Sequence, residues 1–238
     1  MAVHHRSPTC FRRPGRPPRP GATGRRLGIE SLEQRRVMAA SVVVGAGIGG
    51  RPVVSLLDAQ TGAVRGQAMA FEATFTGGVR VAMGDVDGDG TAEVLAASGA
   101  GRVAEIRVFK EQAGSPALKE MVAYRTCPFG SSYRGGVDVA CGDVDANGRE
   151  DVVAAMSRGV GTVNVFLSVN AADPVANVPF RSFNPFGGTF AGGASVAVAE
   201  LGSFSEGRLL NAVIPDGRVE VVVGSGPGTV SYTHLRAH

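Results

Sequence analysis

The chain has 238 residues, including 35 glycines and no tryptophan, and its formal net charge is +3. Residues 1–40 hold nine arginines and two glutamates, a net charge of +7, which leaves −4 for residues 41–238. Because phosphate binding needs a basic face, this acidic bulk argues against a nucleic acid partner. The sequence has no run of about 20 apolar residues, so we expect the protein not to be transmembrane.

The first 40 residues are predicted to form a basic, disordered arm. Arginine, proline and glycine make up the whole of residues 12–20, a composition typical of disorder. The run Leu27–Met38 resembles the N-termini of large exported bacterial surface proteins. A secretory signal would need an apolar core of about 7–15 residues. The one candidate core, Val37–Ile48, overlaps the first predicted strand, so the expectation of export rests mostly on the resemblance.

One pattern begins three times in the chain, at Gly77, Gly135 and Gly192, with steps of 58 and 57 residues. Related strand-like segments follow at Glu93–Ala97, Asp151–Ala155 and Glu220–Gly224, and Ser41–Gly45 looks like the end of an earlier copy. Self-similarity at a fixed period of this size indicates a solenoid, a propeller or a tandem array.

Within one repeat, four short segments read as strands because they are rich in valine, alanine and phenylalanine and are bounded by turn residues. These segments are Val79–Met83, Glu93–Ala97, Ala104–Phe109 and Met121–Arg125. No segment has a capped helical stripe, so the predicted fold class is all-β. Four antiparallel strands per repeat form a β-propeller blade. A stacked β-solenoid is the alternative, although its repeats are usually shorter.

The spacing divides residues 41–230 into a partial blade, 41–76, and three further blades, 77–134, 135–191 and 192–230. A closed propeller has about 4–8 blades. We therefore expect an incomplete propeller fragment whose remaining blades belong to the same chain. Residues 231–238 resemble translated adaptor sequence, and we expect them to be a non-native tail.

Two acidic loops occupy the same place in successive repeats. One contains Asp85, Asp87, Asp89 and Glu93, and the other contains Asp143, Asp145, Asn147 and Asp151. Side-chain oxygens stand at loop positions 1, 3, 5 and 9, and a glycine stands at position 6. Carboxylates this close repel one another unless a cation or solvent screens them. All-oxygen ligands in a flexible turn favour Ca²⁺, and the alternative is a solvated hairpin without an ion.

The segments Gly77–Gly101 and Gly135–Gly161 resemble the FG-GAP or VCBS repeats of bacterial surface proteins, which also build the integrin α-subunit propeller. The resemblance covers about residues 41–230 and implies Ca²⁺ in the hairpin between the first two strands of a blade. The implied ligands are side chains of Asp85, Asp87, Asp89 and Glu93 with the Thr91 carbonyl in the first site, and side chains of Asp143, Asp145, Asn147 and Asp151 with the Arg149 carbonyl in the second.

Two departures from the family pattern affect these expectations. Glu93 stands where the family usually has aspartate, so the geometry of the first site is expected to differ. In the third copy, Glu200 and Gly202 replace the first two aspartates, and only Asp216 and Glu220 recover the end of the motif. This third loop is predicted to bind metal weakly or not at all.

Two other motifs are weaker matches. An EF-hand needs a glutamate at position 12 and flanking helices, but Ala96 and Ala154 stand there and the flanks are strand-like. The Gly45–Gly50 segment matches a dinucleotide-binding pattern, which requires a helix at its last glycine. The following segment, Val53–Leu57, reads as a strand instead.

The sequence does not predict an enzyme. All four histidines lie near the ends, so the repeats contain no histidine for a catalytic triad or a zinc site. Cys141 is expected to be a buried free thiol, with a disulfide to Cys127 as the alternative.

The predicted function is a calcium-binding propeller region of an exported or cell-surface bacterial protein. Its expected role is adhesion to an unknown protein or glycan ligand, with calcium in a structural role. The alternatives are a non-catalytic propeller attached to a secreted enzyme and a structural stalk.

Overall fold

The computed structural model describes residues 41–168, 178–201 and 219–227, together with the backbone of residues 232–236. The chain divides into two units, Met1–Val37 and Met38–His238, and every described residue belongs to the second. The predicted arm and most of the third loop therefore lie outside the described residues. Among the described residues we find no helical segment with the length and hydropathy of a membrane span.

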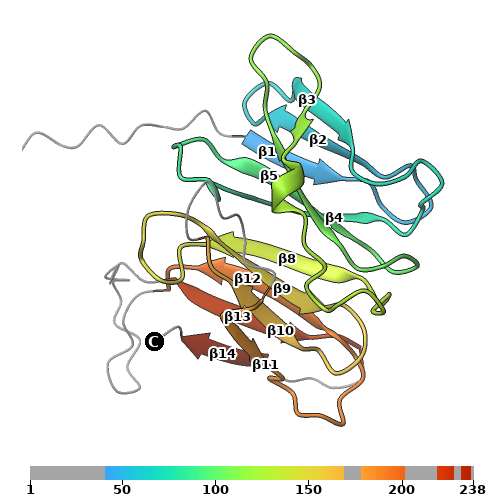
Figure 1. Ribbon diagram of the computed structural model, residues 1–238, viewed down its shortest axis with the longest axis vertical. Helices are drawn as coiled ribbons and strands as arrows, with labels where there is room; N and C mark the ends of the chain where they lie inside the picture. The colour runs from blue at the N-terminus through green and yellow to red at the C-terminus, as the bar shows by residue number, and fades with distance from the viewer. Residues whose placement is uncertain (1–40, 169–177, 202–218, 228–231, 237–238) are drawn as a thin grey trace, which may run out of the picture. The chain divides into compact units, whose positions relative to one another are not determined.

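The described structure is all-β apart from one short 3₁₀ helix, η1 (Val122–Tyr124). The strands are β1 (Ser41–Gly45), β2 (Val53–Asp58), β3 (Val64–Met69), β4 (Val79–Gly84), β5 (Glu93–Ser98), β6 (Ile106–Lys110), β7 (Lys119–Glu120), β8 (Val137–Gly142), β9 (Asp151–Met156), β10 (Val163–Phe166), β11 (Arg181–Phe183), β12 (Ala194–Ala199), β13 (Glu220–Ser225) and β14 (Tyr232–Arg236). They form four antiparallel meanders: β1–β3, β4–β7, β8–β11 and β12–β14 (Figure 1).

The four sheets pack face to face through three hydrophobic cores. Alternate residues of β5 belong to different cores: Val94 and Ala96 face the β1–β3 sheet, whereas Leu95 and Ala97 face the β8–β11 sheet. Because side chains alternate across a strand, a strand covered on both faces is apolar throughout. This explains why β5 and β9 lack the alternating pattern of a half-exposed strand.

The first strands of successive sheets are neighbours in space, with β4 beside both β1 and β8, and β8 beside β12. Glycine permits part of this close approach, because a side chain at Gly142 would lie 2.3 Å from Val198 of the next sheet. Within the described residues the sheets do not close into a ring.

An aromatic pair precedes each of the three double glycines that begin a repeat, Gly77–Gly78, Gly135–Gly136 and Gly192–Gly193. The pairs are Phe71–Phe75, Phe129–Tyr133 and Phe186–Phe190, all in edge-to-face geometry with ring centroids 5.1–5.6 Å apart. The second ring of each pair occupies the space that a side chain would need at the first glycine of the double-glycine turn. The repeat therefore includes a packed corner that the sequence analysis did not identify.

Most of the predicted strands are confirmed, and one is wrong. The segments predicted at Val79–Met83 and Glu93–Ala97 form β4 and β5, each one residue longer than predicted. The fourth strand is not Met121–Arg125 but the preceding two-residue β7. The chain leaves the sheet at Met121, whose carbonyl accepts a hydrogen bond from Tyr124 N–H, and it buries the Tyr124 ring in the core.

The structure also decides two of the alternatives that the sequence left open. No helix follows Gly45–Gly50, because the chain turns into β2, so the dinucleotide-binding alternative is excluded. Cys127 and Cys141 are both free, so the alternative of a disulfide between them is wrong. The segment predicted to be a tail includes β14, which pairs with β13.

The packed corner predicts that Gly77→Ala strongly lowers the free energy of unfolding. A methyl group there would lie 2.2 Å from the carbonyl oxygen of Ala100 and 2.5 Å from the Phe75 ring. Overpacking of this kind typically costs about 1–3 kcal/mol, which urea denaturation would measure. Gly188→Ala is the control, because nothing lies within 4 Å of its added methyl. Equal stabilities of the two variants would contradict the assignment of the corner.

Candidate metal centre

The two acidic loops lie at equivalent places in adjacent sheets. One joins β4 to β5 and the other joins β8 to β9. They also contact each other: Glu150 N–H donates to the Asp85 carbonyl at 3.0 Å, and the Arg149 guanidinium donates to the Asp87 carbonyl at 2.9 Å. The two hairpins therefore form one continuous acidic region.

The aspartate at position 1 shapes each loop by accepting backbone hydrogen bonds. Asp85 accepts the N–H groups of Gly88, Asp89 and Gly90 at 2.7–3.0 Å. Asp143 accepts those of Asn147 and Gly148 at 3.0 and 2.8 Å. Side chains at positions 3 and 5 accept further N–H groups two residues ahead, including those of Thr91 and Arg149. The turns are thus organised by their own side chains, as is usual for aspartate and asparagine.

Positions 4 and 6 of both loops are in the left-handed region of backbone space. Gly88, Gly90 and Gly148 adopt this conformation without a steric penalty. Ala146, at position 4 of the second loop, has a φ of 60° and is the one described non-glycine residue with positive φ. The second loop therefore contains local backbone strain that the first loop avoids.

A buried carboxylate at position 9 closes each hairpin. Glu93, Asp151 and Glu220 are all fully buried, and each begins the second strand of its sheet. Each accepts the N–H of the residue at position 2, which is Val86, Val144 or Leu201, at 2.8–3.1 Å. The third hairpin keeps this contact although its sequence has lost the first two aspartates of the motif.

Burial makes two of these carboxylates, Asp151 and Glu93, costly to ionise. Burial raises the pKa of Asp151 to about 6, although hydrogen bonds from the N–H groups of Ser168 and Val144 oppose the shift. Burial, together with the Asp87 charge, raises the pKa of Glu93 to about 7, and Lys110 opposes it. A cation beside either group would favour its ionised form.

A lysine that the sequence analysis did not identify lies in the first loop. Lys110, the last residue of β6, places Nζ 2.7 Å from Asp87, 2.6 Å from Asp89 and 3.2 Å from Glu93. Burial disfavours the charged ammonium, but these three carboxylates outweigh that effect and raise the Lys110 pKa. The three loop positions that it contacts are among those predicted to bind calcium.

The equivalent residue of the second repeat, 58 positions later, is Ser168. Its N–H donates to Asp151 at 2.8 Å, its hydroxyl donates to the Glu150 carbonyl at 2.9 Å, and its own carbonyl accepts Asn147 Nδ2 at 3.3 Å. None of the described lysines or arginines forms an ion pair with the aspartates of this loop. An alignment of the third strands would have shown this difference between lysine and serine.

The second loop fits a hard cation better than the first. Oxygens of Asp143, Asp145 and Asp151 lie within 4.8 Å of one another, a carboxylate arrangement suited to Ca²⁺. Oxygens of Asp85, Asp87 and Asp89 are equally close, but the Lys110 ammonium already contacts two of these side chains. Of the third loop, Glu200 is exposed and residues 202–218 are outside the described part.

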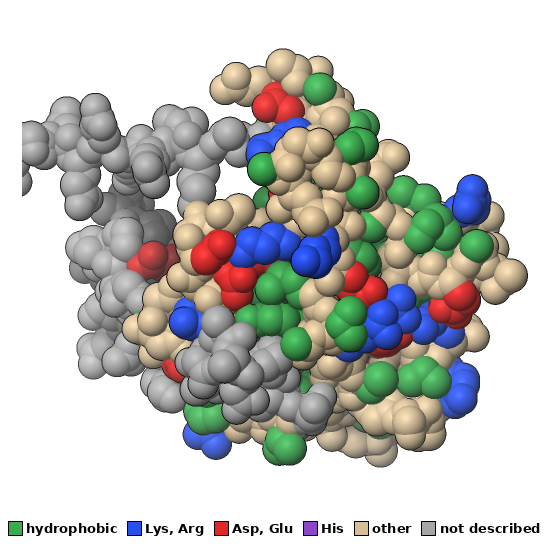
Figure 2. Space-filling model, turned by 45° about the horizontal axis from the view of Figure 1, so that its top comes forward, with side chains coloured by type: hydrophobic (Ala, Val, Ile, Leu, Met, Phe, Trp, Pro, Cys, Tyr) green, Lys and Arg blue, Asp and Glu red, His purple; other side chains and the backbone are tan. Residues whose placement is uncertain are grey.

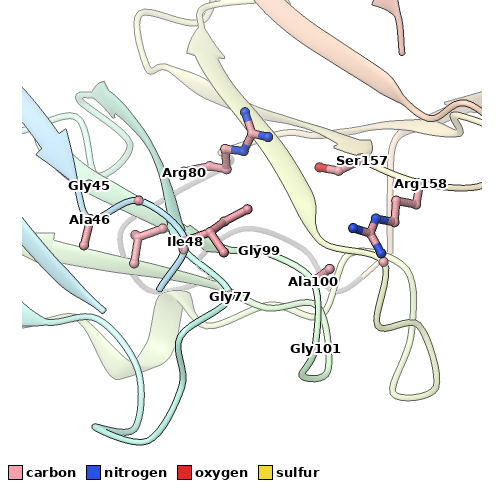
Figure 3. Close-up of a pocket in the computed structure, with 14 residues that line it drawn as sticks. Gly45, Ala46, Ile48, Gly77, Arg80, Gly99, Ala100, Gly101, Ser157 and Arg158 are labelled. Carbon is pink, nitrogen blue, oxygen red and sulfur yellow. The ribbon is translucent and has the colours of Figure 1, made fainter. Parts of the chain in front are cut away.

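A second candidate binding site is an open depression of about 600 Å³ at the end of the strands opposite the acidic loops, near the start of β4 (Figure 3). Glycine-rich turns supply most of its wall, including Gly77, Gly99 and Gly101. Its charged side chains are Arg80 and Arg158. This mostly backbone lining does not indicate a particular ligand chemistry.

Outside the loops, five described arginines form ion pairs with carboxylates, namely Arg65, Arg80, Arg102, Arg107 and Arg125. Arg102 contacts Glu72 at 3.1 Å and Glu105 at 2.8 Å, while its guanidinium lies 4.3 Å from the centroid of the Phe71 ring. On the face shown in Figure 2, basic and acidic side chains lie next to one another. On this face the basic side chains therefore do not form a separate positively charged patch.

A family model described as "Planctomycete extracellular" matches residues 23–42, and no curated protein matches the chain. The match includes Leu27–Met38, the segment from which we predicted export, and it ends within β1. It indicates an extracellular bacterial protein and does not extend to the acidic loops.

The strain at Ala146 predicts that Ala146→Gly stabilises the protein. Relief of a left-handed alanine is worth about 1 kcal/mol, less the entropy that glycine adds to the unfolded chain. Chemical denaturation in EDTA would show a higher midpoint. Ala92→Gly, at position 8 of the first loop, is the control and should destabilise instead. A lower midpoint for Ala146→Gly would show that the alanine is not strained.

The buried carboxylate predicts a large cost for Asp151→Ala even without metal. The change removes the acceptor for both the Val144 and the Ser168 N–H groups. Each unpaired buried group costs about 1–3 kcal/mol, so for the two N–H groups we expect a loss of about 2–6 kcal/mol by denaturation in EDTA. Asp145→Ala, at an exposed residue of the same loop, should cost much less. Comparable losses of stability for the two variants would show that burial of Asp151 does not make it more important than Asp145.

Proposed function

We propose that this chain is part of a calcium-stabilised β-propeller of the FG-GAP or VCBS type from an exported bacterial protein. In this role the sheets are blades, and the acidic hairpins are cross-linked by cations. The observation that supports calcium best is the second loop, where three close carboxylates, one of them fully buried, have no described lysine or arginine partner.

Several features support blades over other stacked β structures. The two complete sheets are four-stranded meanders, and their first strands are neighbours in space. The aromatic pairs recur at steps of 58 and 57 residues, the same steps as the double glycines. Radial repetition of such meanders is the architecture of a propeller.

Calcium suits both the ligands and the compartment. Carboxylate and carbonyl oxygens are hard ligands, which favour calcium or magnesium over zinc. Extracellular calcium modules bind at about 10⁻⁴–10⁻³ M, and the match at residues 23–42 indicates an extracellular protein.

We further propose a binding role without catalysis. The loops serve as structural ties, so the protein or glycan ligand would contact another surface. The depression near Gly77 lies at the opposite end of β4 from Asp85 and is the first surface to examine. Its open, glycine-rich wall suits a macromolecular ligand better than a small molecule, which usually occupies an enclosed apolar cavity.

The calcium proposal predicts a metal-dependent melting temperature. At a calcium concentration ten times the Kd, binding adds about 1.4 kcal/mol, which corresponds to roughly 3–6 °C for a chain of this size. Excess EDTA should remove this gain. Asp145→Asn should abolish most of it, whereas Asp58→Asn, in the β2–β3 turn, should preserve it. Identical melting curves in calcium and EDTA would reject the structural role of calcium.

A further inference from the structure

We propose that Lys110 is the built-in cation of the first hairpin, so that this hairpin does not need calcium whereas the second does. The inference rests on the calcium binding proposed for the second loop. It assigns to Lys110 the role of setting which of two similar loops binds metal.

The contacts of Lys110 match the chemistry of the loop. An ammonium has three N–H donors; the Nζ of Lys110 donates hydrogen bonds to Asp87 and Asp89, and it forms an ion pair with Glu93 at 3.2 Å without a hydrogen bond. The fourth acidic residue, Asp85, already accepts three backbone N–H groups. Every carboxylate of the first loop therefore has a hydrogen-bond or ion-pair partner without a metal ion, although Glu93 Oε1 has only the Lys110 charge at 3.2 Å.

The pairing of β6 with β5 brings Lys110 to the first loop. In the sheet, Phe109 lies opposite Val94, and the buried Phe109 side chain anchors the end of β6. The next residue, Lys110, is thereby brought beside Glu93, the residue before Val94. Glu93 also uses its other oxygen to accept the Val86 N–H. The glutamate at position 9 can thus hold the hairpin and the lysine together.

In the second hairpin, no described basic side chain pairs with the loop carboxylates. Ser168 at the equivalent position offers Asp151 a neutral N–H at 2.8 Å. Arg149 extends to the carbonyl of Asp87 in the neighbouring loop at 2.9 Å and forms no ion pair with its own loop. The negative charge of Asp143, Asp145 and Asp151 is therefore not offset by any described basic side chain.

Lysine and calcium would compete for the same oxygens in the first loop. A divalent ion ligated by Asp87, Asp89 and Glu93 would have to displace the ammonium from all three carboxylates. Displacement costs those contacts and leaves a positive charge near the ion. The first loop therefore binds calcium much more weakly than the second, despite its larger number of carboxylates.

Calcium titration of the full chain by calorimetry tests the inference. The wild type should bind about one ion, Asp145→Asn should bind none, and Asp87→Asn should still bind one. Lys110→Met should bind two ions, and its melting temperature should depend on calcium more strongly than that of the wild type. Lys119→Met, an exposed lysine opposite Lys110 in the sheet, is the matched control and should bind one ion.

The possible outcomes separate this inference from the proposed function. If the wild type binds two ions and Asp87→Asn loses one, the role of Lys110 is wrong while calcium binding stands. If the wild type binds none and Lys110→Met gains one, the calcium proposal for the second loop fails and the role of Lys110 stands. If neither binds calcium, both are rejected. A Lys110→Met protein that folds only with calcium would support the inference.

Discussion

The hairpins depend on a carboxylate that is fully buried at the start of the second strand. Glu93, Asp151 and Glu220 each accept a backbone N–H from the far side of their loop, which fixes the hairpin where the chain enters the sheet. A buried carboxylate is costly unless it is paired and hydrogen-bonded. In the first hairpin the Lys110 ammonium offsets this cost for Glu93. In the second hairpin the N–H groups of Val144 and Ser168 offset it for Asp151.

The two ends of the strands are held by different interactions. At one end lie the acidic hairpins, which are organised by charge and by Asx-type hydrogen bonds. At the other end, an aromatic pair packs against a double glycine, as in the Phe71–Phe75 corner beside Gly77. Between them, middle strands of valine and alanine are buried on both faces, so that each sheet supports its neighbours.

Strands and turns that follow from short-range sequence patterns are predictable from the sequence. Side-chain contacts between residues far apart in the chain are not. The strands β4 and β5 and the loop between them follow from a short-range pattern of apolar and turn residues, and their bounds were predicted within one residue. Lys110 reaches Asp89 from 21 residues away, and Ser168 reaches Asp151 from 17 residues away, so neither contact is visible in the loop motif. Met121–Arg125 was predicted as a strand from its composition, but burial of Tyr124 turns the chain out of the sheet.

Native-state hydrogen exchange tests most directly whether the two hairpins are held by different cations, because it reports local opening of each one. Exchange of the amides of residues 85–93 and 143–151 would be compared in calcium and in EDTA. EDTA should accelerate exchange in residues 143–151 and leave residues 85–93 nearly unchanged. Equal acceleration in both hairpins, or none in either, would contradict the account.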